Sequence, residues 1–122
     1  MQPKCWFMDK KIAKFLEDIR DNITEIEEET AARGKRFEIF CNDRVFRKFI
    51  ERNIGIIGEA VNQILKLKND IEITSARRIV NTRNLVIHSY DNVDNELLWA
   101  IVINHLPILK AEVQQLIESA RK

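Results

Sequence analysis

Residues 46–64 read FRKFIERNIGIIGEAVNQI, and this stretch decides the fold. Asn42 or Asp43 stands before it as an N-cap, and the pattern ends near Lys68. Large apolar side chains recur every three or four positions, which is the spacing of one buried stripe along an α-helix: Phe46, Phe49, Ile50, Ile54, Ile57, Val61 and Ile64. The stretch therefore predicts a long amphipathic helix that buries one face against other helices.

Two glycines interrupt this predicted helix at Gly55 and Gly58. Each costs about 1 kcal/mol relative to alanine in a helix interior, a cost that is understandable if the glycines let another helix approach closely. Their spacing does not match a phosphate-binding loop, and no turn surrounds them. Glu59, beside Gly58, is interpreted as a hydrogen-bonding group within the bundle rather than as an acid catalyst.

The chain before this stretch predicts one more long helix, over residues 9–33, with Gly34 as the C′ residue that closes it. Residues 37–40 are expected to wrap over the end of the bundle. We expect residues 1–8 to be an N-terminal extension and residues 9–122 to be one helical domain.

The chain after residue 70 predicts a third and a fourth helix. Thr74 or Ser75 begins the third helix, and Asp94 reads as the N-cap of the fourth. Pro107 lacks a backbone N–H and should kink the fourth helix near Ile103. The expected fold is an all-α, antiparallel four-helix bundle.

Composition agrees with a single helical domain, because 122 residues with 45% hydrophobic and 32% charged side chains include only 3 glycines and 2 prolines. No apolar run is long enough for a membrane span, and the first residues lack the pattern of a signal peptide. Cys5 and Cys41 are far apart and have no zinc-site spacing, so we expect free thiols in the cytoplasm, with no metal ion and no cofactor.

A net charge of +1 gives no global attraction to nucleic acid, so any RNA site must come from local clusters of basic residues. Such runs are more often solvated helix faces than ligand contacts. Basic clusters occur at Lys10, Lys11 and Lys14, at Arg44, Arg47, Lys48 and Arg52, and at Arg77 and Arg78. Of these, Arg47, Lys48, Arg77 and Arg78 are the candidate RNA contacts.

The stretch that carries chemistry is RNLVIHSY, residues 83–90. Arg83 lies at the centre of an apolar stripe whose members fall within roughly 60° of it around the helix: Ala76, Ile79, Val80, Val86 and Ile87. A guanidinium in that place either pairs with an acidic residue of a neighbouring helix or faces a phosphate or carboxylate ligand. Asn84 shares a helix face with His88, four residues on, and is placed to orient its imidazole.

These residues resemble the signature of the HEPN superfamily, in particular its HepT-like ribonuclease toxins. The signature reads here as Arg83, Asn84, His88 and Tyr90. Three further matches accompany it in the same order as in that group: Ile56 to Ala60, Val93-Asp94, and Asn104-His105-Leu106-Pro107, where the group usually has Asn-Asp-Leu-Pro. Ser89 departs from the group, in which an acidic residue is common at that position.

The resemblance implies a metal-independent endoribonuclease toxin that acts as a homodimer. Arg83 would bind the phosphate, His88 would move protons, and Asn84 would orient either group, so that the RNA 2′-hydroxyl attacks its own phosphodiester and leaves a 2′,3′-cyclic phosphate. The implied partner is a minimal nucleotidyltransferase antitoxin that transfers AMP to Tyr90. The alternative is a non-catalytic HEPN-type helical binding module that partners a nucleotidyltransferase.

Helix geometry sets a condition on this site. Arg83 and His88 lie about 140° apart around an ideal helix, so they converge only if the helix ends there or the arginine bends around. A dimer removes the difficulty, because in the HEPN superfamily the arginine of one protomer can meet the histidine of the other. In that case the apolar stripe around Arg83 would be partly dimer interface.

Overall fold

The computed structural model describes residues 10–74, 76–88 and 94–121, of which residues 85–88 and 121 are described by their backbone alone. Every regular element in these residues is a helix: α1 (Lys10–Ala32), α2 (Phe37–Asn42), α3 (Arg44–Leu67), α4 (Ala76–His88), α5 (Asn95–Ala100), the π-helix η2 (Ile101–His105) and α6 (Leu106–Arg121). The predicted all-α fold is confirmed. The expected extension, residues 1–8, lies outside the described residues.

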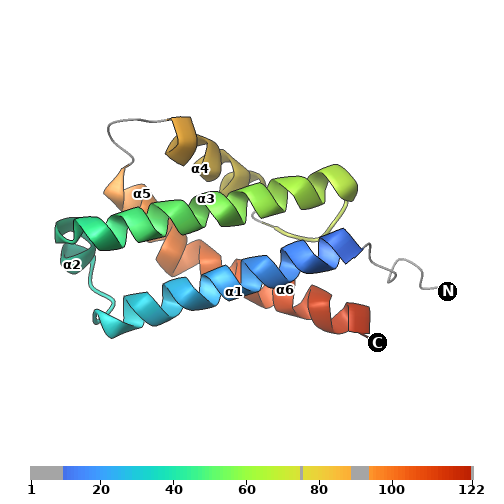
Figure 1. Ribbon diagram of the computed structural model, residues 1–122, viewed down its shortest axis with the longest axis horizontal. Coiled ribbons are helices and arrows are strands. Elements are labelled where there is room, and N and C mark those ends of the chain that lie inside the picture. Colours follow the sequence, from blue (N-terminus) through green and yellow to red (C-terminus); the bar gives the residue numbers. More distant parts are fainter. Residues whose placement is uncertain (1–9, 75, 89–93, 122) are drawn as a thin grey trace.

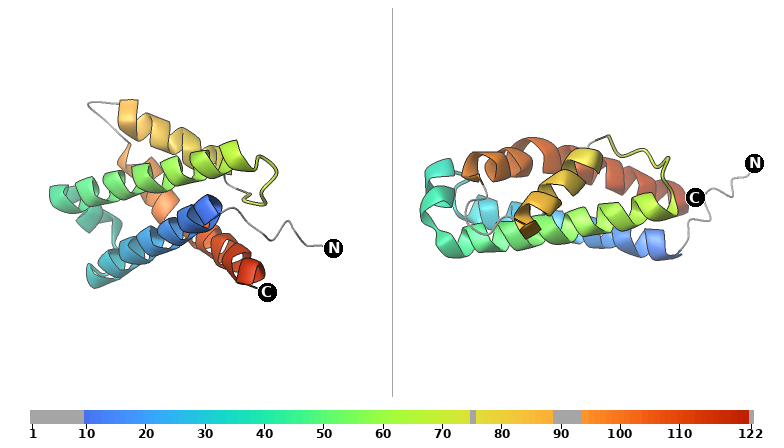
Figure 2. Two further views of the ribbon diagram at one scale, coloured as in Figure 1. Left: turned by 45° about the vertical axis from the view of Figure 1, so that its right-hand side comes forward. Right: turned by 90° about the horizontal axis from the view of Figure 1, so that it is seen from above.

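The four predicted helices correspond to α1, α3, α4 and the continuous run from α5 through η2 to α6. α3 lies in the middle, with α4 on one side and the antiparallel α1 on the other, and α6 packs along α1 (Figures 1 and 2). The apolar stripe of α3 is buried in the shared core, where Ile50, Ile57 and Val61 are fully inaccessible to solvent. α4 is therefore held mainly by α3, so their contact decides where its polar residues lie.

The end of α1 has the predicted glycine closure. Gly34 has φ +82°, a conformation that glycine adopts without steric cost. Its N–H donates to the carbonyl of Ala31, and the N–H of Lys35 donates to the carbonyl of Thr30, both at 3.0 Å. These two bonds satisfy the last carbonyls of α1 in a Schellman motif and turn the chain toward α2.

Aromatic side chains close one end of the bundle, where residues 37–40 were expected to wrap over it. Those residues belong to the short helix α2, whose Phe40 is fully buried. The ring of Phe40 lies 5.3 Å from that of Trp99 and 5.8 Å from that of Phe46, measured between ring centroids. α2 thus connects the start of α3 to α5.

Asp43, one of the two predicted N-cap candidates, is the N-cap of α3. Its carboxylate accepts a hydrogen bond of 2.9 Å from the backbone N–H of Phe46. It also forms an ion pair with Arg33, with 3.3 Å between Oδ2 and Nε. The bond from Phe46, followed by Arg33, holds the pKa of Asp43 below its ordinary value of 3.8. One carboxylate therefore both starts α3 and ties it to the end of α1.

We expect Asp43→Ala to lower the melting temperature by about 4 °C, because α3 loses its cap. Asp43→Asn keeps a capping oxygen and loses only the charge, so its melting temperature should fall less. Since the folded pKa of Asp43 is depressed, the stability that the charge contributes is present above pH 3.8 and is lost as the pH falls through the folded pKa. The difference between wild type and Asp43→Asn should accordingly vanish in acid, and a constant difference across pH would contradict the assigned role.

A π turn lies where the sequence predicted a kink, near Ile103. Pro107 has no N–H to donate to the carbonyl of Ile103, four residues earlier. In the preceding turn the N–H of Leu106 donates to Ile101, five residues back, so residues 101–105 form η2. The widened turn absorbs the missing bond without ending the helix.

The start of α4 is tied to α6. Glu112 of α6 accepts hydrogen bonds from the backbone N–H of Thr74, at 3.2 Å, and from its hydroxyl, at 2.8 Å. Thr74 is one of the two residues that the sequence predicted as the beginning of this helix, and Ser75, the other, lies outside the described residues. Glu112 therefore fixes the point from which α4 crosses α3.

Candidate active site

The crossing of α4 over α3 is closest at Gly58. A Cβ atom at this position would lie 2.3 Å from Cβ and 2.8 Å from Cγ of Arg83, and 3.1 Å from the carbonyl oxygen of Ile79. A Cβ atom does not fit there, because Cβ of Arg83 and the carbonyl oxygen of Ile79 are fixed by the backbone of α4 and cannot swing away. The prediction that Gly58 permits close helix approach is confirmed. Its consequence is that the stem of Arg83 lies directly against the backbone of α3.

The same prediction is wrong for Gly55. A Cβ atom built there has nothing within 4 Å apart from its own helix. Gly55 lies one turn before Gly58 and lines a groove to which α1 also contributes. Spacing along the sequence could not separate the two glycines, because the direction from which α4 approaches depends on the tertiary fold.

Arg83 forms an ion pair with Glu59 of α3, with 2.9 Å between Nη2 and Oε1. The Arg83 side chain is 14% exposed and that of Glu59 is 47% exposed. The other carboxylate oxygen, Oε2, accepts a hydrogen bond of 2.7 Å from Nε2 of Gln63, one turn along α3. Both the intramolecular pairing considered for Arg83 and the hydrogen-bonding role predicted for Glu59 are confirmed. Gln63 was missed, although its i, i+4 spacing from Glu59 was visible.

The guanidinium of Arg83 is incompletely satisfied by these contacts. Its Nε is buried and has no hydrogen-bond partner among the described residues. A buried N–H without a partner is unfavourable, so the side chain is held in place by its packing on Gly58 and by Glu59 rather than by a full set of bonds.

The remaining motif residues lie along α4. Asn84 is exposed, next to Arg83. His88 is the last residue of α4, and its side chain lies outside the described part of the structure, as does Tyr90 altogether. The described part of α4 reaches His88, so the condition under which Arg83 and His88 can converge concerns residues outside the described ranges.

The described part of the apolar stripe around Arg83 packs against α3 of the same chain. Ala76, Ile79 and Val80 are buried in the core that α4 shares with α3. The part of the stripe that the structure describes is thus covered by α3 and does not need a second copy of the chain. Val86 and Ile87, the other members, have no described side chains.

The predicted RNA contacts fall into two separate places. Arg77 and Arg78 are exposed in the first turn of α4, with Arg77 roughly 16 Å from His88 along the helix axis. Arg47 is in α3, where its guanidinium donates to the backbone carbonyls of Phe40 and Cys41 at the end of α2. Lys48, beside it, is exposed. Arg47 therefore has a structural task in addition to any contact with RNA.

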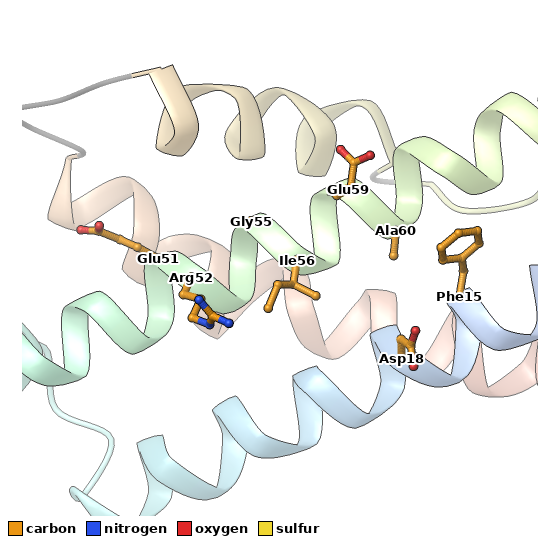
Figure 3. A pocket seen from close by; sticks show the side chains of 8 residues that line it. All are labelled: Phe15, Asp18, Glu51, Arg52, Gly55, Ile56, Glu59 and Ala60. Atoms are coloured by element: carbon orange, nitrogen blue, oxygen red, sulfur yellow. The ribbon is translucent and has the colours of Figure 1, made fainter.

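A groove of about 460 Å³ lies between α1 and α3, on the other side of α3 from α4 (Figure 3). Its floor is apolar and its rim is charged, with contributions from Phe15, Asp18, Glu51, Arg52, Gly55, Ile56, Glu59 and Ala60. Ile56 and Ala60 point toward α1, whereas the carboxylate of Glu59 points toward α4 (Figure 3). Glu59 therefore lines the groove and also pairs with Arg83 of α4.

The described residues contain neither a cluster of metal-binding side chains nor a helix that could span a membrane. No three side chains of the metal-binding types His, Cys, Asp and Glu come together in residues 10–74, 76–88 and 94–121. Within the same ranges, each helix is too short or too polar to cross a bilayer.

The fold and the site define an all-α bundle with a half-buried arginine–glutamate pair where α4 crosses α3. The sequence model of one protein family, described as Ribonuclease HepT-like, matches residues 19–116. Because the match covers most of the chain, this protein belongs to the ribonuclease HepT-like family.

Relatives with curated names agree. The probable ribonuclease HepT of Thermococcus cleftensis is 34% identical over 113 residues, which cover 89% of this chain and 98% of that protein. A Methanocaldococcus jannaschii protein named a putative RNase is 32% identical over 109 residues, 88% of this chain and 98% of its own length. A second protein of that organism, with the same kind of name, is 29% identical over 110 residues, 89% of each chain. No solved structure matches this chain with significance.

Proposed function

We propose that this protein is a metal-independent endoribonuclease with Arg83, Asn84 and His88 as its catalytic residues. The observation that carries the proposal is the family match over residues 19–116, which includes all three residues and the ends of the helix on which they lie. The names of the relatives, all of which specify a ribonuclease, support the same activity.

The chemistry needs only groups of the kinds that these residues supply. RNA carries its own nucleophile, the 2′-hydroxyl, so an enzyme must remove one proton, deliver another and stabilise the charge that grows on the phosphate. An imidazole such as that of His88 can take up and release a proton, and the guanidinium of Arg83 presents a planar fork of donors to a phosphate. Attack of the 2′-oxygen on phosphorus breaks the bond to the 5′-oxygen, leaving a 2′,3′-cyclic phosphate and a 5′-hydroxyl.

The test is to incubate the purified protein with total RNA, with and without a metal chelator, and to identify the ends of the fragments. Cleavage that survives the chelator and leaves 2′,3′-cyclic phosphate and 5′-hydroxyl ends is expected. Cleavage that stops with chelator, or 5′-phosphate ends, would overturn the mechanism.

A specific observation favours one alternative, a non-catalytic module that binds a nucleotidyltransferase. In the isolated chain the guanidinium of Arg83 is already paired with Glu59. An RNA phosphate must therefore share the guanidinium with a carboxylate or displace it. If the protein cuts no RNA yet binds the partner enzyme, this second function is the correct one.

We propose further that the protein is a cytoplasmic toxin and a homodimer, with Arg77, Arg78, Arg47 and Lys48 contacting RNA. Its partner in this proposal is a minimal nucleotidyltransferase antitoxin that transfers AMP to Tyr90. AMP joined to the phenol would bring a phosphodiester charge and a bulky nucleoside close to the end of α4, where His88 lies. Both the charge and the bulk would repel an incoming RNA strand, so modification should silence the enzyme.

We expect Tyr90→Phe to escape neutralisation, because it lacks the hydroxyl that accepts AMP. Mass spectrometry after co-expression should find the added mass of AMP on the wild-type peptide that contains residue 90 and none on the variant. A growth assay gives the second measurement, since cells should survive wild type with the antitoxin and die with Tyr90→Phe. Full neutralisation of the variant without an adduct would show inhibition by binding alone.

A further inference from the structure

We infer that Glu59 is a positioning residue for Arg83, and that Gln63 holds Glu59 for this purpose. The carboxylate sets the direction in which the guanidinium presents its remaining donors to an RNA phosphate. The inference rests on the proposed ribonuclease function and assigns two residues of α3 to the site on α4.

Only part of the Arg83 side chain is free to move. Its Cβ and Cγ lie over the missing side chain of Gly58, so the stem is fixed by the crossing of the two helices. Only the guanidinium end can still turn about its last torsions. Glu59 contacts that end, at 2.9 Å between Oε1 and Nη2.

Glu59 is itself held in one direction. A glutamate that is 47% exposed would ordinarily sample several rotamers. Here Oε1 is ion-paired with Nη2 of Arg83 and Oε2 accepts a hydrogen bond of 2.7 Å from Gln63, so each oxygen has its own partner. The carboxylate is thereby held from both sides, and through the ion pair it fixes the direction of the guanidinium.

The guanidinium of Arg83 keeps donors that Glu59 does not engage. A guanidinium has five N–H groups, one on Nε and two on each Nη. Nε is buried without a hydrogen-bond partner among the described residues, and Nη2 lies 2.9 Å from Oε1 of Glu59. The ion pair engages Nη2, which leaves Nη1 and its two N–H groups to a phosphate oxygen.

The charge of Glu59 affects RNA affinity and the orientation of Arg83 in opposite ways. The negative charge of Glu59 stands next to the group that should bind a phosphate, and it weakens that binding in the ground state. Removing the charge should strengthen RNA binding while releasing the orientation of Arg83. A residue that served only the fold would not produce these two opposite effects, because unfolding does not tighten binding.

The experiment compares Glu59→Gln with wild type in steady-state RNA cleavage. We expect kcat to fall roughly tenfold to a hundredfold, the effect of misplacing a catalytic group by about 1 Å. KM should fall about two- to fivefold, because one half-exposed repulsive charge is removed. The melting temperature should change little, since a half-exposed ion pair contributes little to stability.

Two further variants complete the design. Gln63→Ala leaves the charge of Glu59 in place, so we expect a smaller loss of kcat and an unchanged KM. Glu118→Gln is the matched control, because Glu118 of α6 accepts from Nε2 of Gln114 at 3.1 Å with the same four-residue spacing and lies on a helix other than α3 and α4. It should behave as wild type. Unchanged kcat in Glu59→Gln overturns the inference, and a raised kcat overturns it in favour of Glu59 as a competitor for Arg83.

A readout independent of cleavage separates this inference from the proposed function. NMR signals of the Arg83 guanidinium should show hindered rotation in wild type and in Glu118→Gln, and free rotation in Glu59→Gln. A wild-type protein that cuts no RNA overturns the proposed function, and these signals then decide the positioning inference by themselves. Signals that are alike in wild type and Glu59→Gln overturn the inference even if the protein is a ribonuclease.

Discussion

Replacing His88 with alanine is expected to lower the rate of RNA cleavage by roughly a hundredfold to ten-thousandfold, the usual contribution of a general acid or base. The fold should survive, because His88 is the last residue of α4 and the helix is held by Ala76, Ile79 and Val80 earlier along it. The measurement is single-turnover cleavage of an RNA oligonucleotide, under conditions in which wild type and variant are folded to the same extent. A variant that cuts at the wild-type rate would remove His88 from the mechanism.

Arg83 variants test the other half of the same site. Arg83→Ala should lose as much activity as the histidine variant, and Arg83→Lys should recover little of it, because an ammonium cannot bind two phosphate oxygens with a rigid fork. Mixing Arg83→Ala with His88→Ala tests whether the site is shared between protomers. If it is, about a quarter of wild-type activity should return, since half of the dimers are mixed and each mixed dimer has one intact site. No recovery would place both residues of a site in one chain.

Features that depend on neighbouring residues in the sequence could be predicted. Gly34 closes α1 and Asp43 begins α3, as expected, because both effects act over one turn of the chain. The unusual place of Arg83 in an apolar stripe was equally visible, since helix periodicity alone reveals it. These predictions needed no knowledge of how the helices are arranged.

Features that depend on the arrangement of the helices could not be predicted in the same way. The stripe beside Arg83 is apolar whether α3 or a second protomer covers it, and only the structure shows Ile79 and Val80 in the core with α3. For the same reason the sequence did not identify the acidic residue that pairs with Arg83. Glu59 is 24 residues earlier in the sequence, as the printed numbering shows, and the crossing at Gly58 brings them together.

Gly58→Ala and Gly55→Ala are expected to change stability in opposite directions, although both replace a glycine by the best helix former in the same helix. At Gly55 the new methyl group has nothing within 4 Å, so the variant should gain about 0.4–1 kcal/mol in the free energy of unfolding. At Gly58 the methyl group would lie 2.3 Å from Cβ of Arg83, so α4 must move away from α3. We expect a net loss of about 1–3 kcal/mol, the usual cost of overpacking.

The displacement of α4 in Gly58→Ala should also disable the site, because Arg83 moves with the helix while Glu59 stays on α3. A shift of about 1 Å is enough to reduce the cleavage rate roughly a hundredfold. Urea unfolding measures the stability of both variants. Cleavage is then compared without urea, at a temperature at which each variant is folded. Gly55→Ala should cleave RNA as wild type does. If Gly58→Ala were as stable and as active as Gly55→Ala, the helices would not be in contact at Gly58, and the placement of Arg83 against α3 would be wrong.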